Sequence, residues 1–204
     1  MFLLHSKLWV PSHLLRSLLA ETLSPSMGQL RSPCRNGVLG NQDFESFSIY
    51  GLSIEYPKDC RVEFNPKSRR EEGDVVFHFP DKEKVFLSWG DLEKAMKSFK
   101  TVEEHAEHSL NKVKKGSNVK GFEKVLQGSI TVNSHRGAYN RVRLQEVIVG
   151  FFTGKRTVPR DACSVHLHCI DSSRYFVIYA LLSGSTAEEH EKTLMAMVSS
   201  LRCH

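Results

Sequence analysis

Two histidines in the C-terminal part of the chain have the type and spacing of metal ligands. His166 and His168 lie two positions apart in the alternating stretch 162–170. On a predicted strand this spacing puts both imidazoles on one face, roughly 7 Å apart. Neutral imidazoles so placed can bind zinc or copper, with a further ligand from another element. The alternative is a polar sheet face on which the two histidines bind nothing.

An arginine pair gives a second candidate site. Arg141 and Arg143 alternate with apolar residues in the stretch 138–149, and Tyr139 lies on the same side. If this strand neighbours the one that carries the two histidines, all five side chains form a basic, partly aromatic patch. Such a patch could bind an acidic partner or an anion. The alternative is an ordinary sheet face that is covered by solvent or by a helix.

The segment 150–160 is predicted to be a basic loop. It contains Phe151 and Phe152 close to Lys155 and Arg156. Exposed aromatic side chains beside cations could touch a membrane surface or a protein partner. A loop packed beneath the sheet is the alternative.

Other residues that could do chemistry lack the surroundings they would need. His105 and His108 are three positions apart on a predicted helix, but the zincin motif is absent and a solvated helix face is expected. Cys163 and Cys169 fall on the apolar face of their strand, which predicts buried thiols and leaves a thiol-dependent enzyme as a remote alternative. Nucleotide-binding glycine motifs and the GxSxG motif are also absent. No catalytic activity is therefore expected.

The end of the chain predicts a strand, a tight turn, a second strand and a closing helix. The strand 162–170 alternates, whereas 175–182 is apolar without a break, as in a central strand covered on both faces. The closing helix is predicted over 185–203. It begins with the capping box Ser185–Glu188, which supplies an acceptor for the free backbone N–H groups.

The preceding elements complete an α+β pattern. A second capping box predicts a helix over 101–115, and Asp91 can cap a short helical turn before it. The remaining alternating stretches predict strands at 47–57, 60–64, 74–80, 84–89, 122–132 and 138–149, with a bulge or bend at Gly128. The expected fold is an antiparallel sheet of six to eight strands between helices, an α-β-α sandwich.

The first 42 residues differ in composition from the rest. We interpret 1–42 as a weakly structured leader and linker, or as the product of a misassigned start, and 43–204 as one globular domain. Of the net charge of +5, the leader contributes +3, so the domain carries too little excess charge for a nucleic-acid partner. No transmembrane segment is expected. The five cysteines form no close pairs, which favours reduced thiols and a cytoplasmic protein, with targeting by residues 1–26 as the alternative.

The order of these elements resembles that of PsbP-like domains. The segment Phe47–Pro57, with its Gly-Leu-Ser-Ile-Glu-Tyr-Pro core, is similar to their opening strand, and the closing helix ends in a similar way at Ser199-Ser-Leu201. The resemblance covers roughly 44–203. It implies an antiparallel sheet sandwiched between helices. The family includes a photosystem II extrinsic protein, a nuclear Ran-binding protein and bacterial secretion chaperones, which bind macromolecules without catalysis.

The leading hypothesis is therefore a non-catalytic binding or assembly module. It would dock a protein partner through the sheet face that carries Tyr139, Arg141, Arg143, His166 and His168, without a cofactor. The first alternative is a metal-binding protein that holds a divalent metal at His166 and His168. The second is an enzyme of unrecognised type. A homo-oligomer is compatible with either of the first two.

Overall fold

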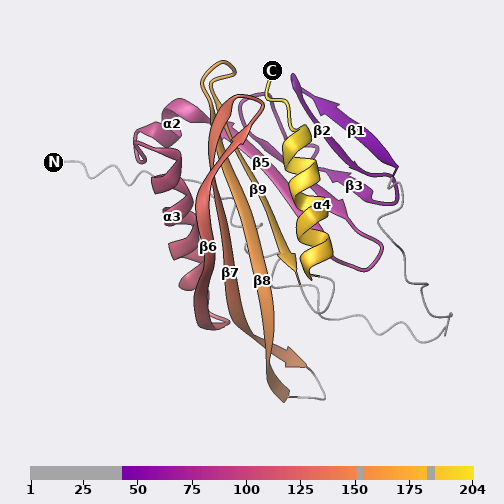
Figure 1. The fold of residues 1–204 in the computed structure, drawn as a ribbon, viewed down its shortest axis with the longest axis vertical. Helices are drawn as coiled ribbons and strands as arrows, with labels where there is room; N and C mark the ends of the chain where they lie inside the picture. Colours follow the sequence, from indigo (N-terminus) through magenta and orange to yellow (C-terminus); the bar gives the residue numbers. More distant parts are fainter. Residues whose placement is uncertain (1–42, 151–153, 183–186) are drawn as a thin grey trace. The chain divides into compact units, whose positions relative to one another are not determined.

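One large antiparallel sheet forms the centre of the domain. The computed structural model describes residues 43–150, 154–182 and 187–204. Seven strands follow one another across the sheet: β3 (Arg61–Phe64), β4 (Gly73–His78), β5 (Lys84–Asp91), β9 (Arg174–Leu182), β8 (Gly154–Cys169), β7 (His135–Gly150) and β6 (Val119–Val132). All neighbouring strands are antiparallel, which confirms the predicted α+β class and sheet size (Figure 1).

The middle strand of this sheet is β9, as its unbroken apolar sequence predicted. Phe176, Ile178 and Ala180 point to one face and are completely buried. Tyr175 and Val177 point to the other face and are half-buried. The middle position explains the missing alternation, because both faces of β9 are covered by other elements.

The helix α4 (Ala187–Ser200) covers one face of the sheet, next to the hairpin of β1 (Phe44–Ile49) and β2 (Leu52–Pro57) (Figure 1). Its buried side chains Leu194 and Met197 complete the main hydrophobic core. Two backbone hydrogen bonds of 2.9 and 2.8 Å between Ser53 and Arg202 fix the segment after α4 to β2. The helix is shorter than predicted at its end, and the predicted cap at Ser185 lies outside the described residues.

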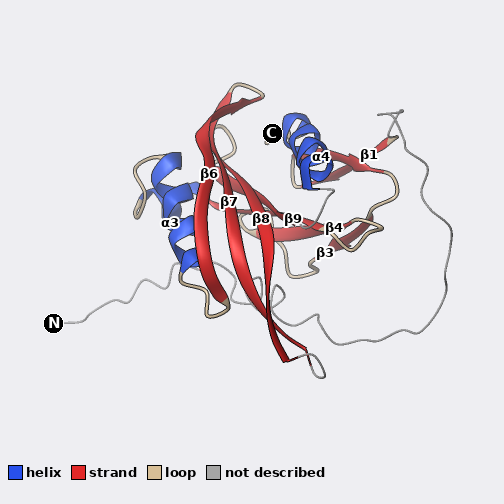
Figure 2. Cartoon of the chain, turned by 60° about the horizontal axis from the view of Figure 1, so that its bottom comes forward, coloured by secondary structure: helices blue, strands red, loops and turns tan. Residues whose placement is uncertain are grey.

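The helices α2 (Leu92–Met96) and α3 (Val102–Lys114) belong to the opposite layer, where α3 packs on β6, β7 and β8 (Figure 2). Thr101 accepts a hydrogen bond from the Glu104 backbone N–H at 3.1 Å, and Glu104 accepts one from the Lys100 backbone N–H at 2.7 Å. This is the predicted capping box with its return bond one residue earlier. The predicted cap at Asp91 also forms, with the Lys94 backbone N–H at 3.0 Å.

Two predictions of local structure, the bulge at Gly128 and the loop 150–160, were wrong. The bulges of β6 lie between Val119 and Gly121 and between Lys124 and Leu126, whereas Gly128 pairs regularly with Tyr139. The supposed loop 150–160 is mostly strand, because β8 already begins at Gly154. Its charged residues resembled a loop in sequence, since a strand exposed on both faces has no apolar alternation. Phe151 and Phe152 lie outside the described residues.

Cys60, Cys163, Cys169 and Cys203 are buried and free. None of the helices in the described ranges has the length and apolar character required to span a bilayer.

Candidate binding site

The strands β7 and β8 are neighbours, but the predicted five-residue patch does not form. Ala138 lies opposite His166, Tyr139 opposite Val165 and Arg141 opposite Cys163. Directly opposed residues share a face of the sheet. Tyr139, Arg141 and Arg143 are therefore on the α4 side, while His166 and His168 are on the α3 side. Joining them into one patch was wrong, because a shift of one residue in register exchanges the faces and alternation alone does not fix the register.

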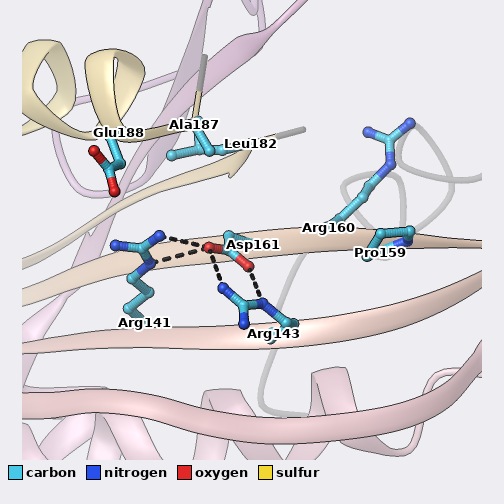
Figure 3. Close-up of a pocket in the computed structure, with 8 residues that line it drawn as sticks. All are labelled: Arg141, Arg143, Pro159, Arg160, Asp161, Leu182, Ala187 and Glu188. Carbon is cyan, nitrogen blue, oxygen red and sulfur yellow. Dashed lines mark hydrogen bonds and ion pairs between the residues drawn. The ribbon is translucent and has the colours of Figure 1, made fainter. Parts of the chain in front are cut away.

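A buried carboxylate holds the two arginines on the α4 side (Figure 3). Arg141 donates to Asp161 Oδ2 through Nη2 at 2.6 Å and through Nε at 3.1 Å. Arg143 Nε donates to Asp161 Oδ1 at 3.0 Å. Burial opposes ionisation of Asp161, but the hydrogen bonds from Arg143 and Arg141 outweigh this effect and hold its pKa below the ordinary value. Asp161 was missed in sequence because it lies at the edge of the supposed loop.

Helix α4 contributes Glu191 to this ion-pair network. Glu191 accepts a hydrogen bond from Arg141 Nη1 at 2.6 Å and another from the Tyr139 hydroxyl. Burial raises the pKa of Tyr139, and the hydrogen bond to Glu191 raises it further. Tyr139 is 8% exposed, and Arg141 has carboxylates on two sides. Both residues therefore fasten α4 to the sheet and offer little to a partner.

Arg143 differs from Arg141 because it borders an open cleft. Its side chain is 47% exposed, against 19% for Arg141. The cleft has a volume of about 350 Å³ and lies beside the first turn of α4; it is lined by Arg141, Arg143, Pro159, Arg160, Asp161, Leu182, Ala187 and Glu188 (Figure 3). Asp161 fixes Nε and Nη2 of Arg143, so the remaining N–H groups of this guanidinium are available at the cleft.

From this cleft, β7 and β8 continue as a projecting arm, which extends past the last β6 pair at Glu146 (Figures 1 and 2). Its pairs run from Arg143–Asp161 to Gly150–Gly154. Lys155 and Arg156 are exposed near its end. Neither of them forms an ion pair with another described residue. The arm therefore carries unneutralised positive charge away from the body of the sheet.

On the opposite face, the two predicted histidines meet a third one. His105 of α3 lies with its Nδ1 at 3.2 Å from His168 Nε2, and its ring stacks on Phe99. His166 Nε2 is 3.1 Å from the Ser109 hydroxyl. The solvated position predicted for His105 was wrong, whereas His108 is exposed as expected. Helical spacing could have revealed this, because His105 falls on the buried stripe next to Ala106.

Burial keeps this histidine cluster neutral. Burial lowers the pKa of His105 to about 3, and the neighbouring His168 adds to the effect. Burial also lowers the pKa of His166 well below its ordinary value. The imidazoles of His105 and His168 hydrogen-bond to each other, and the imidazole of His166 hydrogen-bonds to Ser109. Metal binding by His166 and His168 stays a prediction.

Comparison with known proteins identifies the fold. No protein-family model and no curated protein sequence matches the chain. The solution structure of the cyanobacterial PsbP protein (CyanoP) from Synechocystis is similar, with a TM-score of 0.58 and 11% identity, over 85% of this chain and 98% of CyanoP. The crystal structure of the Saccharomyces cerevisiae Ran-binding protein Mog1p gives a TM-score of 0.53 and 9% identity, over 80% of this chain and 96% of Mog1p. The chain thus has a PsbP-like fold, as its order of elements predicted.

Proposed function

We propose that the protein is a non-catalytic binding module that docks an acidic, extended segment of a protein partner along the β7–β8 arm. The observation that carries this proposal is the half-exposed guanidinium of Arg143, which Asp161 holds in place at an open cleft. A guanidinium fixed before binding loses little conformational freedom when it pairs with a carboxylate. The similarity in fold to Mog1p, a Ran-binding protein, supports a protein partner.

The arm determines the direction and the length of the proposed docking surface. In the register of β7 and β8, Arg143 and Val149 are six residues apart on the same face, and Lys155 lies opposite Val149. The distance along the strand is roughly 20 Å, enough for an extended segment of about six residues. Val149 is 61% exposed, so an apolar side chain of the partner can contact it beside Lys155.

The chemistry around the cleft favours binding over catalysis. Asp161 is committed to two arginines. The nearest thiol, that of Cys163, is completely buried. Burial raises the pKa of Cys163 to about 11, so the thiol is protonated at neutral pH and is a poor nucleophile. Buried free thiols also fit a reducing compartment, and we propose a cytoplasmic location.

The test compares partner binding by the full chain and by Arg143→Gln/Lys155→Gln. Partners captured by the wild-type protein are purified, and their affinities are measured at two salt concentrations. We expect the double variant to bind at least about tenfold more weakly, because each lost charge contact is worth about 1 kcal/mol or more. Wild-type affinity should fall with added salt, since the contacts are solvent-exposed.

The matched control is Lys58→Gln/Lys120→Gln, which removes the same charge from exposed positions on β6 and just after β2. It should bind like the wild type. Equal affinity for the arm variant and the wild type would contradict the proposal. So would an equal loss in the control, which would show that only net charge matters.

A further inference from the structure

Four side chains with metal-binding atoms converge at the end of the sheet opposite the tip of the arm. They are His135 at the start of β7, Cys169 at the end of β8, Asp171 in the following turn, and His204 after α4. Each offers one ligand atom, and these atoms all lie within 4.8 Å of one another. They come from three separate stretches of chain, so they do not form a short sequence motif.

The two separations between the Cys169 sulfur and the imidazole nitrogens are close to those of a tetrahedral zinc site. Cys169 Sγ lies 3.6 Å from His204 Nδ1 and 3.9 Å from His135 Nε2. Zn–S bonds of about 2.3 Å and Zn–N bonds of about 2.0 Å at tetrahedral angles put the sulfur and nitrogen ligands roughly 3.5 Å apart. Small shifts of these three side chains would therefore let them bind one ion, and the Asp171 carboxylate also has an oxygen within 4.8 Å of each of the other ligand atoms.

Burial and charge around Cys169 also favour a metal site. Cys169 is completely buried, His135 is half-buried, and Asp171 and His204 are exposed, so an ion can enter from the solvent side. Arg174 lies directly opposite Cys169 on β9 and is 4% exposed. Its Nε and Nη1 have no hydrogen-bond partner among the described residues. A buried cation here would be the counter-charge of a metal-bound thiolate.

The segment that carries His204 is fixed before any ion binds. Arg174 Nη2 donates to the Cys203 carbonyl oxygen at 2.8 Å, and the Asn133 side-chain amide donates to the Leu201 carbonyl oxygen at 2.6 Å. The backbone pair of Ser53 and Arg202 adds a third attachment.

We propose that His135, Cys169, Asp171 and His204 form a structural zinc site. Two imidazoles, a thiolate and a carboxylate are a ligand set typical of zinc. Because the protein supplies all four ligands, the shell is closed and the ion links the segment after α4 to the β8–β9 turn. This site is distinct from His166 and His168, which face the α3 layer.

Zinc binding can be tested with the full chain, purified under reducing conditions without a histidine tag. Zinc content is measured after purification, and the affinity of the chelator-stripped protein is measured by competition with a chromophoric chelator. We expect one zinc per chain and a higher Tm with zinc than without. Cobalt in place of zinc should give thiolate charge-transfer bands and the visible spectrum of a tetrahedral complex.

The decisive variants are His204→Gln and Asp171→Asn, since both positions are exposed and neither change should affect folding. Loss of an outer-shell partner already lowers metal affinity about tenfold or more, so each variant should lose at least that factor. The exposed His108→Gln is the matched control and should bind zinc like the wild type. Micromolar zinc that fails to bind would overturn the proposal. So would zinc affinity unchanged in both ligand variants.

Discussion

Lowering the pH from about 7 to about 5 should reduce the free energy of unfolding by about 4 kcal/mol, because His105 and His166 are buried as neutral imidazoles. The pKa of His105 is lowered to about 3, and that of His166 is lowered well below 6.5. Below pH 6.5 the unfolded chain therefore binds two protons that the folded protein does not. Each contributes a loss of about 1.4 kcal/mol per pH unit.

Urea unfolding at a series of pH values measures this dependence. His105→Phe keeps a ring against Phe99 but cannot be protonated, so the slope between about pH 6 and about pH 5 should fall to roughly half. His108→Gln removes an exposed histidine from the same helix and should keep most of the slope. A slope in His105→Phe as steep as in the wild type would show that other groups cause the acid sensitivity.

Replacing Asp161 by Ala should destabilise the fold by about 3 kcal/mol, because it leaves two arginines without their shared carboxylate. The Asp161 side chain is only 9% exposed. The cost should lie at the lower end of the range for buried pairs, since solvent reaches Arg143. The carboxylate's contribution is present above pH 3.8 and is lost as the pH falls through its lowered pKa. This loss begins only below pH 3.8, whereas that of the histidines begins near pH 6.5.

Glu103→Ala provides the comparison for Asp161→Ala. Glu103 also pairs with an arginine, Arg136, but the two side chains are 38% and 74% exposed. Its loss should cost less than about 1 kcal/mol in the same urea experiment. Equal losses of stability in the two variants would show that burial does not make the ion pairs of Asp161 more stabilising than the exposed pair of Glu103.

More of the fold than of the candidate site could be predicted from the sequence. Apolar runs and capping boxes identified β9 as a central strand and located α3, because these signals are local. The fold class did not depend on the exact ends of β7 and β8, so the misplaced loop 150–160 left it intact.

The candidate site depended on pairings that local patterns do not contain. The alternation of His166 and Arg141 was read correctly within each strand, but only the register shows that they lie on opposite faces. Asp161 and Glu191 neutralise Arg141 from positions 20 and 50 residues away. The converging group that ends at His204 spans three stretches of chain. Packing determines long-range contacts of this kind, so they produce no characteristic residue spacing in the sequence.

The two layers that cover the sheet are unequal, and this difference predicts how the domain opens. The α4 side shares one continuous core that includes Phe176, Leu194 and Met197. Within the part of the chain that the structure describes, the α3 side has two small apolar clusters, around Ala106 and Leu110, with the neutral histidines beside them. Less apolar burial means a smaller free energy of local opening. The backbone amides of α3 should therefore exchange their hydrogens before those of α4 and β9, and the gap should widen in acid as each opening exposes imidazoles that take up protons.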